Sequence, residues 1–268
     1  MSVAAANEMR TPPNRILVKE VNWLGDLVIS LPALRELRRA HPRAEVSVLV
    51  KRELAGFFDG MEWLDEVMPY NVGSGIARLR DQLAIVNEIR ARRFDLAVLF
   101  PNSFASALWV ALAGVPRRVG YAADGRALLL TDRVKRRPEL AGSHQRGEWL
   151  ALVRDASGSE ELETGVLDWP LEVAGKNRQA VCTWLSAVRR QPGVPLVALA
   201  PGAAFGPAKE WPGEHYASLI DLIGNRYGGE CVLIGGAGER GRCAEIAAQA
   251  KTPAIVAAGE TSIGELIA

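Results

Sequence analysis

Short apolar, β-branched segments alternate with segments of helical periodicity along most of the chain, and this alternation restricts the fold most strongly. The segment Ile16 to Val21 precedes a helical segment from Asp26 to His41, and Leu96 to Phe100 is apolar on both faces, as strands inside parallel sheets are. Strands alternating with helices predict parallel sheets covered on both faces. Further strands are predicted at Val46 to Val50, Glu66 to Pro69, Arg118 to Tyr121, Val197 to Ala200, Cys231 to Ile234 and Ala254 to Ala257, and further helices at Glu53 to Phe58, Ile76 to Arg92, Ala105 to Ala113, Lys176 to Arg190, Glu214 to Tyr227 and Arg240 to Ala250.

The chain is expected to form two doubly wound α/β domains, because residues 158–175 are polar, broken by Gly and Pro, and without periodicity. We predict an N-terminal domain over residues 15–157 and a C-terminal domain over residues 176–268. Only three strands are predicted in the second domain, whereas a doubly wound sheet usually has about five or six. We therefore expect the second domain to be truncated, and a naturally small domain is the alternative.

Pro32 interrupts the first helical segment. Proline is tolerated in a first helical turn, and Ser30 lies two residues earlier. The pattern predicts a kink or a restart of the helix at this point, with Ser30 as the cap.

Charge is distributed unevenly, and this predicts an anionic partner for the first half. Residues 1–150 hold 22 Lys and Arg against 17 Asp and Glu, a net charge of +5, whereas residues 151–268 hold 10 against 14, a net charge of −4. The alternative is that the basic stretches are only solvated helix faces. Aromatic residues do not interleave with them, which argues against a nucleic-acid partner.

Apolar runs stay well below the roughly 20 residues that span a bilayer, so we expect a soluble protein. The first residues lack the apolar region of a secretory signal, and three cysteines without CxxC spacing fit the cytoplasm. The histidines show no metal-ligand spacing, so we expect no metal. They are His41, His144 and His215.

Three turns after predicted strands carry candidate chemistry, since ligands of open α/β sheets bind at the carboxyl ends of strands. In the first, Gly25 allows close approach of the backbone to a ligand, and Asp26 is either a general base or a helix cap. In the second, small residues expose backbone N–H groups to an anion, and Lys209 either neutralises a departing diphosphate or is a solvated loop residue.

The third turn contains a G-x-G-x-x-G sequence, with an acidic residue near the end of the next predicted strand. This layout matches the dinucleotide fingerprint, but such turns are common in this architecture. Glu239 either is stabilised by the helix dipole or binds ribose hydroxyls. An NAD-dependent oxidoreductase is therefore the alternative to the function below. The residues are Gly236, Gly238 and Gly241, with Glu260.

Five stretches together resemble the lipopolysaccharide heptosyltransferases, glycosyltransferase family 9. The opening ILVKEVNWLGDLVISLPALR at residues 16–35 is similar to the start of that family. FPNSF at residues 100–104 and RRVGY at 117–121 resemble its first-domain segments, and PGAAFGPAKEWP at 201–212 with LIGG at 233–236 resembles its donor-binding half.

The resemblance implies a GT-B fold of two Rossmann-like domains, with the acceptor bound mainly by the first and the nucleotide-sugar by the second. It implies transfer of heptose, with inversion, from ADP-heptose to the inner core of lipopolysaccharide, without a metal or other cofactor. Because this acceptor is a lipid, we expect a cytoplasmic protein bound peripherally to the anionic inner membrane surface. The family holds its donor with an Asp-Ser-Gly-Pro-type turn that comes shortly after the point where this chain ends, so an inactive remnant is a further alternative.

Carried over by position, the resemblance assigns Asp26 as the general base and Lys209 as the residue beside the donor diphosphate. It places Glu239 at the nucleoside, and Thr261 and Ser262 at the adenine. The other donor-site residues expected are Gly25, Ala204, Phe205 and Gly236, and the acceptor-site residues are Asn102, Ser103, Tyr121 and His144.

Overall fold

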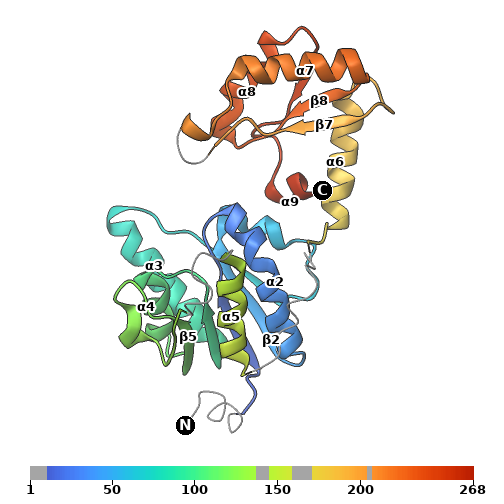
Figure 1. The fold of residues 1–268 in the computed structure, drawn as a ribbon. Helices are drawn as coiled ribbons and strands as arrows, with labels where there is room; N and C mark the ends of the chain where they lie inside the picture. Colours follow the sequence, from blue (N-terminus) through green and yellow to red (C-terminus); the bar gives the residue numbers. More distant parts are fainter. Residues whose placement is uncertain (1–10, 137–144, 159–170, 204–206) are drawn as a thin grey trace. The chain divides into compact units, whose positions relative to one another are not determined.

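The computed structural model describes residues 11–136, 145–158, 171–203 and 207–268 (Figure 1). The chain divides into two compact units, residues 1–172 and residues 173–268. Each unit contains one parallel β-sheet among its described residues.

The first unit is built on six parallel strands in the order β3-β2-β1-β4-β5-β6. Ile16 of β1 lies opposite Val46 of β2 on one side and Leu96 of β4 on the other. The strand order reverses between β1 and β4, and such a switch point is where doubly wound sheets bind ligands. The strands are β1 (Arg15–Lys19), β2 (Glu45–Lys51), β3 (Glu66–Tyr70), β4 (Leu96–Leu99), β5 (Arg117–Tyr121) and β6 (Asp132–Val134).

Helices cover both faces of this sheet, because its strands are apolar on both sides. The helices α3 (Gly75–Arg92) and α4 (Phe104–Leu112) share one core with strand residues such as Leu17 and Leu99. The helices α2 (Leu24–Ala40) and α5 (Gln145–Ser157) pack against each other (Figure 1). Two short 3-10 helices complete the unit, η1 (Arg52–Phe58) and η2 (Arg126–Leu129).

Of the kink or restart predicted at Pro32, the restart is absent, and the predicted Ser30 cap was wrong. Helix α2 runs through Pro32 without a restart, and its N-cap is Trp23. Ser30 lies buried inside the helix, where its hydroxyl is within hydrogen-bonding distance of the Leu27 carbonyl, at 2.9 Å, and of the Glu20 carboxylate, at 3.1 Å. The serine therefore ties the helix to the end of β1 and caps nothing.

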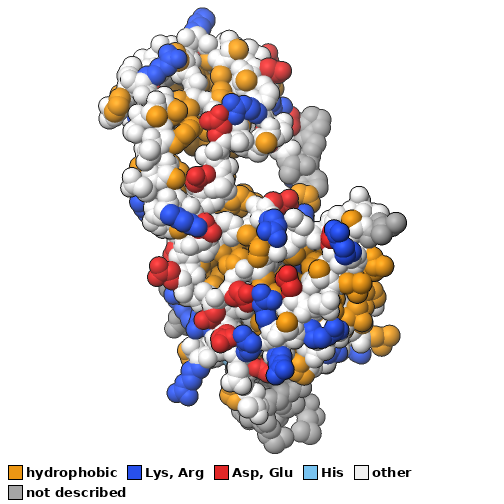
Figure 2. Space-filling model, turned by 180° about the vertical axis from the view of Figure 1, so that it is seen from behind, with side chains coloured by type: hydrophobic (Ala, Val, Ile, Leu, Met, Phe, Trp, Pro, Cys, Tyr) orange, Lys and Arg blue, Asp and Glu red, His pale blue; other side chains and the backbone are white. Residues whose placement is uncertain are grey.

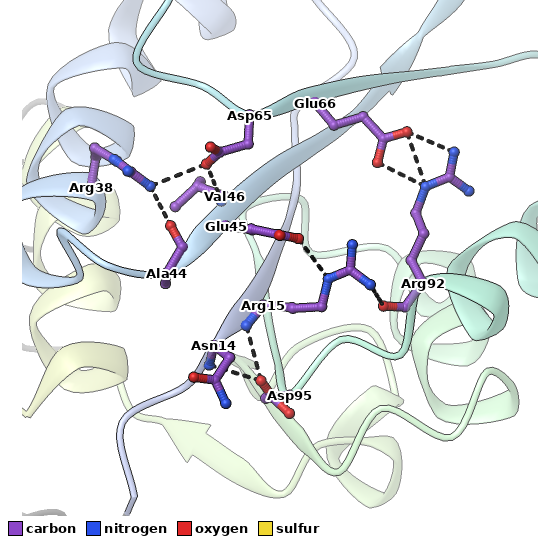
Figure 3. A network of polar contacts seen from close by, with 10 residues as sticks. All are labelled: Asn14, Arg15, Arg38, Ala44, Glu45, Val46, Asp65, Glu66, Arg92 and Asp95. Carbon is purple, nitrogen blue, oxygen red and sulfur yellow. Dashed lines mark hydrogen bonds and ion pairs between the residues drawn. The ribbon is translucent and has the colours of Figure 1, made fainter.

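Carboxylates fix the amino ends of the strands (Figure 3). Asp95 accepts hydrogen bonds from the backbone N–H groups of Asn14 and Arg15, at 2.8 and 2.9 Å. Glu66 pairs with Arg92 at the end of α3, with the shortest N–O distance 2.7 Å. These carboxylates therefore hold the starts of neighbouring strands and the end of α3 together at the amino edge of the sheet.

The second unit has three parallel strands in the order β7-β8-β9 among its described residues. The residues of α7 and α8 form its core with β7 and β8. No helix in the described parts of either unit is both long and apolar enough to cross a membrane. The elements are α6 (Gly175–Val188), β7 (Leu196–Leu199), η4 (Pro207–Lys209), α7 (Gly213–Tyr227), β8 (Glu230–Leu233), η5 (Ala237–Glu239), α8 (Arg240–Gln249), β9 (Ala254–Val256) and α9 (Ile263–Ile267).

Candidate functional site

The turn after β1 presents the carboxylate of Asp26 in the first turn of α2. Trp23 is the N-cap and no side chain caps the helix, so Asp26 is not the cap residue that the alternative required. Partial burial raises the pKa of the Asp26 carboxyl above its usual range. A carboxylate with a raised pKa is a stronger base, which suits proton abstraction. Gly25 precedes it, and a Cβ at Gly25 would meet no atom within 4 Å.

Lys19 lies fully buried at the end of β1 and forms part of a cavity of about 480 Å³. Its ammonium donates to the Glu20 carbonyl and to Asn22 Oδ1 at 3.3 Å, and it lies 4.8 Å from the centre of the Tyr70 ring. Burial lowers the pKa of Lys19 to about 7. A buried ammonium beside an open cavity favours binding of an anion, which would stabilise its charged form.

Further charged groups line the same cavity, and they come from separate elements of the first unit. Lys51 ends β2, and Arg78 lies in the first turns of α3. Two carboxylates, Glu53 and Asp81, also line it. The Glu53 carboxylate lies 3.3 Å from Lys51, and the Asp81 carboxylate accepts the Gly73 N–H at 3.0 Å. The cavity therefore combines cations with hydrogen-bond acceptors, as a site for an acidic, hydroxyl-rich ligand would.

Two of the predicted acceptor residues, Asn102 and Tyr121, line a second cavity of about 590 Å³ at the ends of β4 and β5. Lys135 and Arg136 line it as well. Tyr121 is buried, and its hydroxyl donates to the Glu148 carbonyl of α5 at 2.5 Å. The Tyr121 hydroxyl is thus engaged inside the protein.

Ser103 lines the first cavity instead. Its hydroxyl caps α4 by accepting the Ser106 N–H at 3.4 Å. The structure therefore separates Ser103 from the cavity that holds Asn102 and Tyr121. His144 lies outside the described residues.

Arg126, which the sequence patterns did not single out, organises the loops around the second cavity. Its guanidinium is completely buried, and burial lowers the pKa of Arg126 to about 10. It donates to the Tyr121 carbonyl at 2.9 Å, to Ser106 Oγ at 3.2 Å and to Asn102 Oδ1 at 3.3 Å, and also to the Pro101 carbonyl. One side chain thereby holds the ends of β4 and β5 and the start of α4 together.

In the second unit, Glu239 brings the turns after β7 and β8 together. Its Oε2 accepts the Gly236 N–H at 2.6 Å. Its Oε1 lies against the backbone of Gly202, where a Cβ would come within 1.4 Å of it. The N–H group of Gly236, the first glycine of the G-x-G-x-x-G turn, is therefore already hydrogen-bonded to the protein's own Glu239 carboxylate.

This contact contradicts the dinucleotide interpretation of that turn. A dinucleotide places its pyrophosphate against the N–H groups of the glycine turn, and a carboxylate already bound there would repel it. The acidic residue of the fingerprint, Glu260, is engaged as well, since it pairs with Arg240 at 2.8 Å. The geometry gives no support to the oxidoreductase alternative.

Lys209 ends the 3-10 helix η4 and is exposed in the turn after β7. The next residue, Glu210, pairs with Arg242 of α8, and Arg242 also donates to the Trp211 carbonyl at 3.0 Å. The two residues that follow Lys209 are thus held against α8. The predicted donor residues Ala204 and Phe205 lie outside the described residues.

Ser262 begins α9, and its hydroxyl accepts the Glu265 N–H at 3.3 Å while Glu265 accepts the Ser262 N–H at 2.7 Å. The Ser262 hydroxyl therefore caps a helix, and Thr261 precedes it, half-buried. In the described part of the chain, no three His, Cys, Asp or Glu side chains gather as a metal site would require.

A family model, curated relatives and a solved structure all match this chain and are all heptosyltransferases. The model of "Glycosyltransferase family 9 (heptosyltransferase)" matches residues 82–268. Lipopolysaccharide heptosyltransferase 2 of Escherichia coli is 30% identical over 94% of this chain, which covers 73% of that protein. The Salmonella typhimurium protein of that name is 32% identical over 83% of this chain, which covers 64% of it.

A solved structure agrees with these relatives. The structure described as E. coli ADP-heptose lps heptosyltransferase II superposes with a TM-score of 0.79 at 28% identity, covering 94% of this chain and 75% of that one. Together with the two parallel sheets, this match confirms the predicted fold class, two Rossmann-like α/β units of the GT-B type.

Proposed function

Because the chain belongs to glycosyltransferase family 9 (heptosyltransferase), and is therefore a glycosyltransferase, we propose that it moves heptose from ADP-heptose to the inner core of lipopolysaccharide. The names of its relatives support both substrates, since they are lipopolysaccharide heptosyltransferases and one is described with ADP-heptose. The observation that carries the catalytic part is the Asp26 carboxylate, which stands at the carboxyl end of β1 with a raised pKa and is not the helix cap.

Asp26 acts as the general base in this proposal. The acceptor hydroxyl attacks the anomeric carbon of heptose from the face opposite ADP, so the configuration at that carbon inverts. The bond from the anomeric carbon to the diphosphate oxygen breaks as the new bond forms. The proton of the attacking hydroxyl passes to the Asp26 carboxylate, and ADP leaves with the electron pair.

The second unit holds the donor in this proposal. Lys209 neutralises the charge that develops on the diphosphate, so no metal is needed for that step. The turn around Gly236 and Glu239 contacts the nucleoside, and Thr261 lies toward the adenine. Ser262, the cap of α9, follows Thr261 in the segment that we assign to the adenine.

The first unit binds the acceptor in this proposal. The cavity containing Lys19, Lys51 and Arg78 suits the carboxylates and phosphates of acidic inner-core sugars. The excess of positive charge in residues 1–150, +5 against −4 in the remainder, supports peripheral attachment at the cytoplasmic face of the anionic inner membrane, where this lipid is made.

Transfer by the Asp26→Asn variant tests the central role. Asparagine keeps the shape of the side chain but cannot accept the proton, so we expect transfer to slow about a hundredfold or more, with ADP affinity and melting temperature nearly unchanged. Glu62→Gln is the matched control, because it neutralises an exposed carboxylate of the same unit in the segment that precedes β3. Near-normal turnover by Asp26→Asn would refute the assignment. ADP binding without any transfer by the unmodified chain would favour the inactive remnant.

A further inference from the structure

Exposed apolar side chains collect on the outer side of α3 and α4. Leu79 and Leu83 project from α3, and Phe104 and Leu112 from α4, each about half exposed or more. Leu128 of η2, which packs against α4, is 86% exposed. Figure 2 shows hydrophobic side chains gathered along the edge of the first unit where Figure 1 draws α3 and α4.

The helices α3 and α4, which carry most of these apolar residues, lie side by side. Trp109 Nε1 of α4 donates to Gln82 of α3 at 3.4 Å, and Arg90 of α3 donates to the Leu112 carbonyl at 2.7 Å. Leu79 and Leu83 are four residues apart and therefore lie on one side of α3. We call Leu79, Leu83, Phe104, Leu112 and Leu128 the apolar face.

The helix α3 carries basic residues as well as part of the apolar face. Residues 75–93 contain five arginines against two carboxylates, Asp81 and Glu88. One of these arginines is paired with Glu66 at the amino edge of the sheet, whereas Arg80, next to Leu79, is strongly exposed and pairs with the neighbouring Asp81 at 3.4 Å. The arginines are Arg78, Arg80, Arg90, Arg92 and Arg93. Exposed apolar side chains next to exposed arginines complement an anionic bilayer surface.

The apolar face also borders the first cavity. Leu79 follows Arg78 on α3, and Arg78 lines that cavity. Phe104 lies between Ser103 and Ala105, and both of these residues line it too. A membrane lying against the apolar face would therefore meet the mouth of the cavity.

We propose that the apolar face docks on a membrane of anionic phospholipids, with its leucines and Phe104 entering the headgroup region and its arginines facing lipid phosphates. This proposal rests on the proposed function, because docking brings the first cavity to the level at which a lipid-linked sugar acceptor leaves the bilayer. The acceptor's acyl chains stay in the membrane while its acidic sugars enter the cavity.

Vesicle binding by the full chain tests the docking face. We expect binding to vesicles containing phosphatidylglycerol and little binding to pure phosphatidylcholine. The double variant Leu79→Gln with Leu83→Gln should bind about thirtyfold more weakly, from roughly half the transfer free energy of two leucines. The matched control is Leu222→Gln with Tyr227→Gln, which removes two side chains of α7 that are 48% and 64% exposed, against 65% and 51% for Leu79 and Leu83. The control should bind as the unmodified chain does.

The outcomes separate the docking face from the catalytic proposal. Equal losses in the two double variants, or no loss in either, would overturn the docking face. A dimer in light scattering that becomes monomeric in the Leu79 and Leu83 variant, without vesicle binding, would make the face a contact between copies and also overturn it. With a soluble acceptor lacking acyl chains, the variant should retain its turnover. Absence of all transfer by the unmodified chain, with vesicle binding intact, would count against the proposed function and not against the docking face.

Discussion

Replacing Lys19 with methionine should stabilise the first unit at neutral and acidic pH while weakening its hold on an anionic acceptor. The Lys19 side chain is buried, and burial lowers its pKa from 10.5 to about 7. One pKa unit corresponds to about 1.4 kcal/mol, so charging this ammonium costs the folded state about 5 kcal/mol. Methionine fills a similar volume without a charge. It gives up the contacts of the ammonium with Asn22 and Tyr70, so we expect a net gain of about 2–3 kcal/mol at pH 6.

The pH dependence of this gain has a defined sign. Below pH about 7 both the folded and the unfolded chain carry the Lys19 proton, and the full cost is present. Between pH about 7 and 10.5 the folded chain has lost this proton while the unfolded chain still holds it, so the stability of the unmodified protein rises with pH. By pH 9 roughly half of the cost should have disappeared, and the advantage of methionine should shrink accordingly.

The neighbouring carboxyl titrates in a different range. Burial raises the pKa of Glu20 from 4.5 to about 7, so its contribution to stability falls as pH rises from 4.5 to about 7. Comparing pH 7.5 with pH 9 therefore isolates Lys19.

Urea denaturation of the Lys19→Met variant at pH 6, 7.5 and 9 measures the effect. Lys51→Met is the control, because Lys51 lines the same cavity but its side chain is 40% exposed. Its charge is the last of the causes that act on the Lys19 pKa, so this variant should give a much smaller pH-dependent gain than Lys19→Met. A destabilised Lys19→Met variant, or a gain of equal size at pH 6 and pH 9, would refute the reasoning. Acceptor binding should weaken in the variant below pH 7, where it has lost a cation.

Two further changes test the donor half. Lys209→Ala should lower both turnover and ADP affinity, because one cation serves both the bound and the departing diphosphate, and added magnesium should restore neither. Unchanged ADP affinity in calorimetry would mean that Lys209 is a solvated loop residue. Gly202→Ala should push the Glu239 carboxylate off the Gly236 N–H, because the new methyl would lie within 1.4 Å of Glu239 Oε1. This substitution should lower the free energy of unfolding by about 1–2 kcal/mol in thermal unfolding. It should also weaken ADP binding, and Glu239→Ala should have the same effect. Normal ADP binding by both variants would argue against a nucleoside role for Glu239.

Most strands and helices could be predicted from sequence because the alternation of apolar and helical patterns is regular. The strand β6 and the helix α5 were not predicted. β6 has only three residues, Asp132–Val134, and two of them are charged. α5 owes its position to packing on α2 and to Trp149, which stacks on Phe100 with ring centres 6.0 Å apart. Such a contact joins residues about fifty positions apart, and local periodicity carries no information about it.

The residues of the candidate site also fall into those that the sequence indicates and those that it does not. Asp26, Lys209 and Glu239 could be proposed because each follows a strand, and the carboxyl ends of parallel strands gather at one edge of a sheet. Lys19 and Arg126 could not, because charged side chains are usually exposed and nothing local indicates their burial. Tyr121 was predicted at the acceptor site, and the sequence does not indicate that its hydroxyl donates to a carbonyl of α5 that lies 27 residues away.

The glycine-rich turn after β8 shows that a match to the dinucleotide fingerprint in the sequence must be checked against the hydrogen bonds of the turn. Three glycines and a following acidic residue satisfy the dinucleotide fingerprint, yet the Gly236 N–H is bound by the chain's own Glu239. A carboxylate at that point leaves no place for a phosphate there, so the diphosphate of a nucleotide-sugar must find its counter-charge elsewhere in the unit. The turn after β7 carries Lys209 and is held next to Glu239 through Gly202. In a dinucleotide enzyme one turn binds the phosphates. In the function that we propose, two turns divide this work: the turn with Glu239 contacts the nucleoside, and the turn with Lys209 contacts the leaving group.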